Sequence, residues 1–283
     1  MKIVVASGKG GTGKSTVAAN LAYSLLDRHP VTLVDCDVEV PNLHLFFDSE
    51  PETRDVFTTI PKVDTDLCTL CGDCGNFCRY GAIAVLKDRV LIFEKMCHAC
   101  GGCMIVCPEK AISETPYPIG LVEDSNPLSG LRLISGFLKE GEVLAPRIIR
   151  SAKEMAEDDE IVIIDSSPGI ACPVIEAMED TDFCILVTES TPFGLHDLDL
   201  AVGVTKNLGL NTGVVINRSD GSDEEVRDYC AEADIPVLMT IPFDKEIASV
   251  QNKGGLISER MPGWKEQFAC MYDECLRIGG VGI

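Results

Sequence analysis

The chain has 283 residues, of which 46% are hydrophobic, and its 45 acidic against 24 basic residues give a formal net charge of −21. Such a chain is a poor match for nucleic acid or for an anionic membrane, because both attract positive charge. We therefore expect no nucleic-acid partner. The length allows one large domain with a smaller one beside it.

The N-terminal segment combines an apolar strand, a glycine-rich turn and a helix. Residues 2–7 predict a buried strand, and the apolar face of residues 14–27 predicts a helix. The turn between them has the G-x4-G-K-[ST] spacing of a phosphate-binding loop, in which backbone N–H groups and a lysine bind phosphates and a hydroxyl binds Mg²⁺. The predicted nucleotide ligands are Gly8, Gly10, Gly11, Thr12, Gly13, Lys14, Ser15 and Thr16, with Ser15 also on the magnesium.

Short apolar strands alternate with helices along much of the remaining chain. Strands are expected at 31–34, 160–164, 184–188, 213–216 and 236–240, and helices at about 195–208 and 223–233. This alternation predicts an α/β fold in which a mostly parallel sheet is flanked by helices. A final helical stripe from Trp264 to Ile278 carries acidic as well as basic residues, so we expect it to pack in the core or in a dimer. We expect no stable membrane insertion.

Residues 62–113 interrupt the alternation with eight of the chain's 14 cysteines. The pattern C-x2-C-x2-C-x3-C occurs twice, 29 residues apart, as Cys68, Cys71, Cys74 and Cys78 and as Cys97, Cys100, Cys103 and Cys107. Because the α/β pattern resumes afterwards, we interpret the segment as a small inserted α+β domain within an ATPase domain of residues 1–61 and 114–283. Residues 114–143 are rich in proline and glycine and predict a loop-rich return.

The cysteine spacing resembles that of bacterial ferredoxins with two [4Fe–4S] clusters. The resemblance implies that each cluster takes its fourth ligand from the other repeat. One ligand set would be Cys68, Cys71, Cys74 and Cys107, and the other Cys97, Cys100, Cys103 and Cys78. The competing metal is zinc, although its sites usually separate two cysteine pairs by a longer loop.

The nucleotide motifs resemble those of the MinD/Mrp-type P-loop ATPases with a deviant Walker A motif. Lys9 is the additional lysine of that motif, and the resemblance implies that it reaches across an ATP-bound homodimer to the partner's nucleotide. By the same resemblance Asp37 would orient the attacking water, with Asp35 and Asp165 in the magnesium shell. Asn217 and Pro242 resemble the positions that contact adenine.

Together, these resemblances imply a cytoplasmic ATPase with ATP, Mg²⁺ and two [4Fe–4S] clusters as cofactors. Our leading hypothesis is that ATP hydrolysis by Lys9, Lys14 and Asp37 is coupled to electron transfer or to metalloprotein maturation with a partner protein. One alternative is an iron–sulfur assembly or carrier ATPase. Another is a MinD- or ParA-like positioning ATPase whose clusters are structural or sensory.

Overall fold

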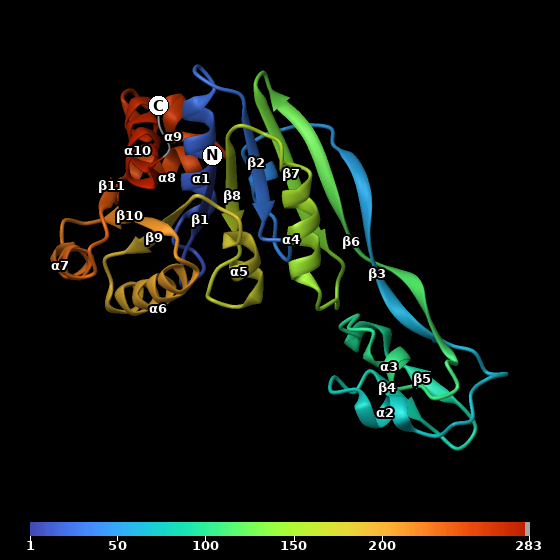
Figure 1. The fold of residues 1–283 in the computed structure, drawn as a ribbon. Coiled ribbons are helices and arrows are strands. Elements are labelled where there is room, and N and C mark those ends of the chain that lie inside the picture. Colours follow the sequence, from blue (N-terminus) through green and yellow to red (C-terminus); the bar gives the residue numbers. More distant parts are fainter. Residues whose placement is uncertain (281–283) are drawn as a thin grey trace.

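The computed structural model describes residues 1–280, which form a layered α/β body and a small appended unit (Figure 1). The first half contains β1 (Lys2–Ala6), α1 (Lys14–Leu25), β2 (Val31–Cys36), η1 (Leu43–Leu45), β3 (Glu52–Val63), α2 (Asp73–Phe77), β4 (Ile83–Val85), β5 (Val90–Ile92), η2 (Glu94–Met96), α3 (Gly102–Ile105), β6 (Ile112–Leu128) and β7 (Leu131–Leu138). The second half contains α4 (Ala145–Glu154), β8 (Val162–Ser166), α5 (Cys172–Met178), β9 (Phe183–Glu189), α6 (Pro192–Leu208), β10 (Asn211–Ser219), α7 (Glu224–Glu232), β11 (Val237–Pro242), α8 (Lys245–Gln251), α9 (Ile257–Arg260) and α10 (Trp264–Gly279).

A nine-stranded sheet organises the body in the order β11-β10-β9-β1-β8-β2-β7-β6-β3. The strands from β11 to β7 are parallel, whereas β6 is antiparallel to both β7 and β3. The predicted α/β fold with a mostly parallel sheet is therefore confirmed.

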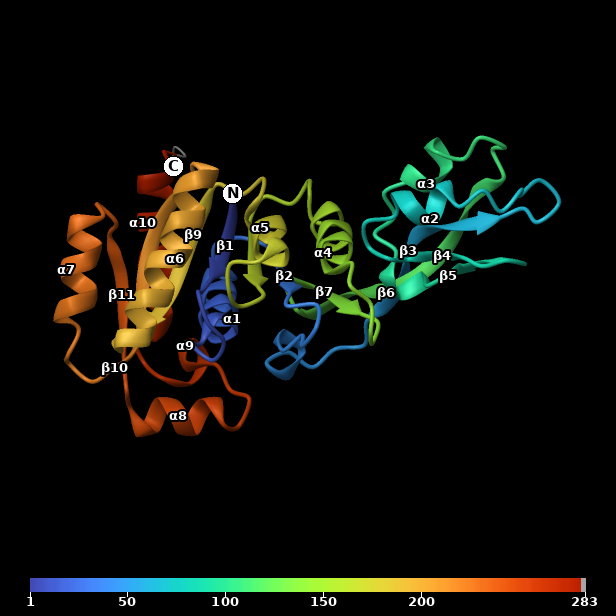
Figure 2. The same cartoon turned by 90° about the horizontal axis from the view of Figure 1, so that it is seen from below.

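Helices cover both faces of this sheet (Figure 2). On one face, α1 and α10 pack through residues such as Leu21 and Phe268, and on the other α4, α5 and α6 pack through residues such as Ile148, Val174 and Leu198. The apolar residues Phe268, Met271 and Cys275 of α10 are buried against this core, as predicted for the C-terminal stripe. Within residues 1–280, no helix is both long and apolar enough to cross a bilayer.

The loop-rich return predicted for 114–143 is wrong, because β6 and β7 occupy most of it. Pro116 and Pro118 lie in the part of β6 that pairs with β3 but not with β7. A proline cannot donate to a neighbouring strand, and an edge without such a neighbour tolerates it. The long β3–β6 ribbon carries the cysteine-rich segment, residues 64–111, beyond the end of the body (Figure 1).

The cysteine-rich segment contains α2, α3 and the hairpin β4–β5. Its buried core is small, because Cys74 and Ile83 pack only with Ile112, at the start of β6, as a further buried apolar residue of this cluster. A core of this size contributes little hydrophobic stabilisation, and natural units of this kind usually need disulfides or metals to fold. None of the eight cysteines of this segment is in a disulfide, so disulfides do not supply that stabilisation.

Candidate nucleotide site and cysteine cavities

The glycine-rich loop joins the end of β1 to the start of α1. Gly13 immediately precedes α1 with a φ of 96°, a backbone conformation that favours glycine. At Gly8 the limit is space, because a Cβ there would lie 2.1 Å from the carbonyl oxygen of Asp197. The sequence therefore needs glycine at these two positions for different physical reasons.

Lys14 is the central charge of this loop and is only 6% exposed. Burial lowers its pKa, while the carboxylates of Asp165 and Asp37 oppose that shift. A buried ammonium in this loop is placed to neutralise the charge of bound phosphates.

Asp165 lies at the end of β8 and is buried, and neither of its carboxylate oxygens has a hydrogen-bond partner among residues 1–280. Burial raises its pKa well above the usual value, and neighbouring Asp35 adds to the rise, whereas Ser15 and Lys14 oppose it. An orphaned buried carboxylate is costly unless something compensates for it. This donor, with the Ser15 hydroxyl nearby, fits a hydrated Mg²⁺.

Asp35 anchors the loop that follows β2. Its carboxylate accepts hydrogen bonds from the backbone N–H groups of Asp37 at 3.1 Å, Asn42 at 2.8 Å and Leu43 at 2.9 Å. Burial nevertheless raises its pKa to about 6. These contacts give Asp35 a structural role in the loop that follows β2, and its place in a magnesium shell stays a prediction.

A cavity of about 560 Å³ opens above the loop, which is within the usual range for small-molecule sites. Seven predicted residues line it, namely Gly10, Gly11, Gly13, Lys14, Ser15, Thr16 and Asp37. Leu45, Phe46, Pro168, Gln251, Asn252 and Gly254 also line it and were not predicted. Gln251 and Asn252 lie at the end of α8, so only the fold brings them to this cavity.

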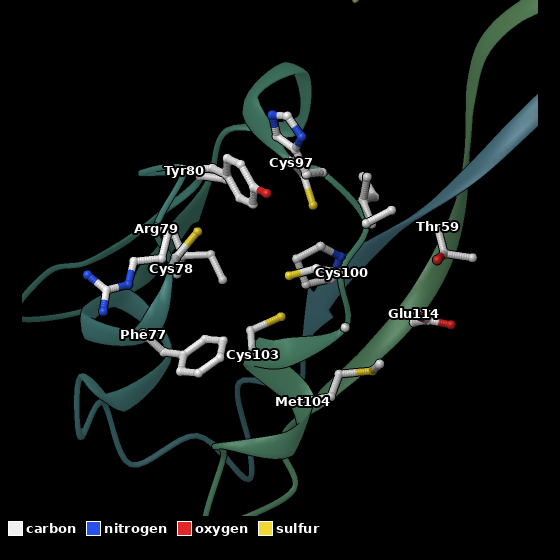
Figure 3. Close-up of a pocket in the computed structure, with 17 residues that line it drawn as sticks. Thr59, Phe77, Cys78, Arg79, Tyr80, Cys97, Cys100, Cys103, Met104 and Glu114 are labelled. Carbon is white, nitrogen blue, oxygen red and sulfur yellow. The ribbon is translucent and has the colours of Figure 1, made fainter. Parts of the chain in front are cut away.

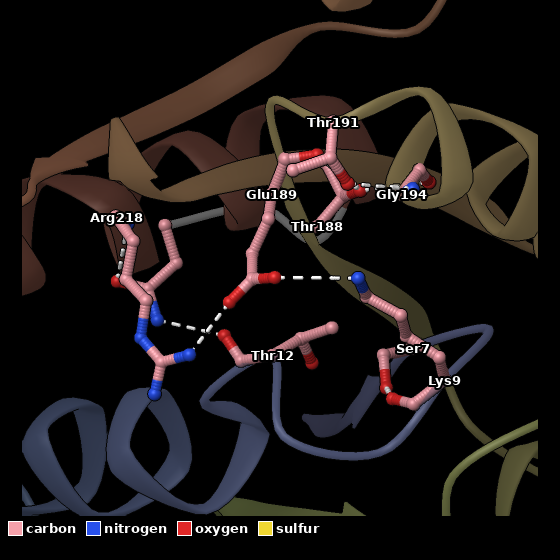
Figure 4. Close-up of polar contacts among 9 residues, drawn as sticks. Ser7, Lys9, Thr12, Thr188, Glu189, Thr191, Gly194 and Arg218 are labelled. Carbon is pink, nitrogen blue, oxygen red and sulfur yellow. Dashed lines mark hydrogen bonds and ion pairs between the residues drawn. The ribbon is translucent and has the colours of Figure 1, made fainter. Parts of the chain in front are cut away.

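Lys9, Glu189 and Arg218 form a charged network beside the loop (Figure 4). The ammonium of Lys9 lies 3.3 Å from the Glu189 carboxylate, whose other oxygen accepts a hydrogen bond from Arg218 at 2.8 Å. The Lys9 side chain is 30% exposed, so the pair is partly hydrated and can exchange partners. In this state Lys9 contacts a carboxylate of its own chain.

Asn217 and Pro242, the predicted adenine contacts, do not line the nucleotide cavity. The side-chain amide of Asn217 donates to the carbonyl oxygen of Thr12 at 2.7 Å, and its oxygen accepts from the backbone of Arg218 at 2.9 Å. Asn217 therefore holds the phosphate loop through the Thr12 carbonyl. Pro242 is exposed at the end of β11.

The eight repeat cysteines surround two separate cavities. Cys78, Cys97, Cys100 and Cys103 line the first, where Figure 3 shows sulfur atoms directed toward a common space. Cys68, Cys71, Cys74 and Cys107 line the second. Each cavity thus combines three cysteines of one repeat with the fourth cysteine of the other.

The thiols of each cavity are close enough to interact electrostatically. Burial raises the pKa of Cys97, and Cys100 and Cys78 add to the rise. For residues 1–280, however, no three histidine, cysteine, aspartate or glutamate side chains converge on a point where they could hold a metal ion. A cubane cluster has four irons and holds its thiolates farther apart than one ion does. The thiol donors and their grouping fit such a cluster, which stays a prediction.

The sequence also matches a known family. The profile of the "CobQ/CobB/MinD/ParA nucleotide binding domain" matches residues 3–257. The chain belongs to this family. An uncharacterized protein of Methanocaldococcus jannaschii is 31% identical over 258 residues, which cover 90% of each chain. The septum site-determining protein MinD of Helicobacter pylori is 23% identical over 267 residues, which cover 89% of this chain and 81% of that protein.

The fold is also that of this family. The septum site-determining protein MinD of Pyrococcus horikoshii, solved with Mg-ADP, superposes with a TM-score of 0.61 at 21% identity, covering 99% of this chain and 97% of that one. This likeness confirms the P-loop fold and agrees with the β1–loop–α1 arrangement. It says nothing about the cysteine-rich segment.

Proposed function

We propose that the protein is a cytoplasmic Mg²⁺-dependent ATPase whose nucleotide state is coupled to an inserted iron–sulfur unit of residues 62–113. In the nucleotide site, backbone N–H groups of Gly8, Gly10–Gly13 and Thr16 would surround the phosphates. Lys14 would neutralise the phosphate charge, and Ser15 and Asp165 would hold the magnesium. Asp37 lines the same cavity and orients the attacking water. Magnesium held by Ser15 and Asp165 would supply positive charge to offset that of the phosphates.

The proposed active form is a homodimer with ATP between its subunits. Lys9 then leaves Glu189 and reaches the nucleotide of the partner. The partial exposure of the Lys9–Glu189 ion pair supports this exchange. Arg218 would remain beside Glu189 and neutralise its charge after Lys9 has left. We assign Asn217 to holding the phosphate loop through the Thr12 carbonyl, and the adenine contacts of Asn217 and Pro242 stay predictions.

The observation that carries the iron–sulfur proposal is the division of eight cysteines between two cavities. Cysteines without a common role would not be expected to group in this way, with three from one repeat and the fourth from the other around each cavity. Two [4Fe–4S] clusters supply one-electron chemistry when bound. The protein's residues position them, because Cys68, Cys71, Cys74 and Cys107 surround one and Cys97, Cys100, Cys103 and Cys78 the other. The partner is a redox protein or a metalloprotein undergoing maturation.

Stopped-flow spectroscopy of the anaerobically purified protein tests this proposal. We expect the protein to contain iron and acid-labile sulfide. We also expect the rate at which an artificial acceptor oxidises the dithionite-reduced protein to change when ATP·Mg is added. A Lys14→Ala variant with intact clusters is the control, and its rate should not respond to ATP. Rates that are equal with and without ATP in the parent protein would refute the coupling.

A second candidate is a positioning ATPase, and the named relatives favour it. The relatives named above include septum site-determining proteins, and the matching family includes ParA. In this case the cysteine unit would be structural or sensory. Nucleotide-dependent polymer formation, measured by pelleting and retained after Cys74→Ser and Cys103→Ser, would support it over the first candidate.

A further inference from the structure

Helix α4 lies between the nucleotide half of the molecule and the base of the cysteine-rich segment (Figure 2). Its residues Ala145, Ile148, Ile149 and Ala152 are buried against the sheet. Basic side chains at Arg147, Arg150 and Lys153 extend from it toward two different neighbours. A helix packed in this way moves as a body and can transmit a displacement from one neighbour to the other.

On the nucleotide side, α4 is tied to α5. Arg150 forms a two-point ion pair with Glu176, with both distances at 2.9 Å. Lys153 donates to the backbone carbonyls of Glu176 at 2.6 Å and Glu179 at 2.5 Å. The carbonyls at a helix C-terminus have no partner within the helix, so a cation there is favourable.

Helix α5 is in turn connected to the nucleotide site. Only the loop of residues 167–171 separates it from β8, which carries Asp165. That loop contacts the nucleotide-binding segments, since Gly169 donates its N–H to the carbonyl of Ser7 at 2.9 Å and the Ser167 hydroxyl donates to the carbonyl of Cys36 at 3.1 Å. A change at the γ-phosphate that shifts this loop therefore shifts the start of α5.

On the opposite side, α4 and the residues just before it contact β3, β6 and the cysteine-rich segment. Arg147 donates to the hydroxyl of Thr58 on β3 at 2.7 Å, and Thr58 is 2% exposed. Tyr117 on β6 donates to Glu142 at 3.0 Å, and Lys95 donates to the carbonyl of Glu140 at 3.1 Å.

These contacts end beside one of the two cysteine cavities. The residues directly after Thr58, namely Thr59, Ile60 and Pro61, line the cavity of Cys78, Cys97, Cys100 and Cys103. Lys95 precedes Cys97 by two residues. The cavity of Cys68, Cys71, Cys74 and Cys107 has none of these three lining residues.

We propose that α4 transmits the nucleotide state to the cavity of Cys78, Cys97, Cys100 and Cys103, with Arg147 as the positioning residue that holds β3 to α4. This inference rests on the proposed function, because it assumes that nucleotide changes the cysteine-rich segment. It assigns the response to one of the two cavities. Arg147 touches neither nucleotide nor cysteine and acts through Thr58.

The experiment is hydrogen–deuterium exchange on the full, anaerobically purified chain with and without a non-hydrolysable ATP analogue and Mg²⁺. In the parent protein, the analogue should change exchange in residues 57–61 and 93–104, with a smaller change in residues 66–74. Arg147→Met keeps the aliphatic stem but removes the donors, and Thr58→Val removes the acceptor. Each variant should lose the response of both segments while its analogue affinity and ATPase rate stay at parental values.

Two comparisons make the result specific. Arg28→Met makes the same substitution at an exposed arginine that pairs with Asp273 on the other face of the sheet, and it should leave the response intact. The double variant Arg147→Met/Thr58→Val should lose no more than either single variant, because the two side chains share one bond. A full response in Arg147→Met and Thr58→Val would overturn the relay, as would a loss in Arg28→Met. No response in the parent protein would instead overturn the proposed coupling.

Discussion

Replacement of single cysteines tests the exchange of ligands between the two repeats. If each cavity holds one [4Fe–4S] cluster, the chain binds about eight irons, and loss of one cavity leaves about four. Cys107→Ser should therefore remove the cluster shared with Cys74, although Cys107 lies in the same repeat as Cys103. The structure groups Cys107 with Cys68, Cys71 and Cys74 around one cavity and leaves Cys103 in the other.

Pairs of replacements measure this grouping directly. Cys74→Ser/Cys107→Ser should keep about four irons, as each single variant does, because both side chains belong to one cavity. Cys74→Ser/Cys103→Ser should keep almost none. The assay is iron and acid-labile sulfide per chain with electron paramagnetic resonance of the reduced protein. Cys172→Ser replaces an exposed cysteine outside both cavities and is the matched control.

Two results would refute the reasoning. If Cys74→Ser/Cys107→Ser lost all iron while Cys103→Ser/Cys107→Ser kept half, each cluster would belong to a single repeat. If every single variant lost all iron, the cavities would not be independent sites. Circular dichroism of each variant checks that the β3–β6 ribbon and the body remain folded.

Three further predictions concern the nucleotide site. Gly8→Ala places a Cβ 2.1 Å from the Asp197 carbonyl oxygen, so overpacking should lower the free energy of unfolding by about 1–3 kcal/mol in urea denaturation, and a parental value would contradict this reading. Asp165→Asn removes an unpartnered buried charge, so the nucleotide-free protein should unfold at higher denaturant while phosphate release falls to background; lower stability would contradict this reading of the site. The pKa of Asp35 is raised to about 6, so the folded state binds more protons than the unfolded state between roughly pH 4 and 6. The contribution of Asp35 to the free energy of unfolding therefore falls as pH rises through that window. In urea denaturation, the slope of the unfolding free energy against pH should be more positive there in Asp35→Asn than in the parent protein. An unchanged slope would assign the effect to another group.

Local patterns were enough to predict the phosphate loop and its flanking elements. The strand at 2–7 and the helix at 14–27 correspond to β1 and α1, because burial on one face leaves a periodic trace in the sequence. The antiparallel arm was missed for the opposite reason. Residues 114–143 contain prolines that usually indicate loops, yet Pro116 and Pro118 lie at a free edge where their missing N–H groups cost nothing.

The nucleotide cavity shows a similar division. Gly10 to Thr16 are adjacent in the chain, so a motif identifies them. Gln251 and Asn252 reach the same cavity from α8, and no local pattern marks them. Asn217 was expected at the base but holds the carbonyl of Thr12, which depends on where β10 ends relative to the loop.

By itself, the sequence determined the phosphate loop, the parallel core and the two cysteine repeats, because each depends on residues that are close in the chain. Only the tertiary structure decided that Lys9 contacts Glu189 and that Arg147 joins α4 to Thr58. Those arrangements depend on the register of strands far apart in sequence. A long-range register is set by packing of the whole core, and no short segment contains that information.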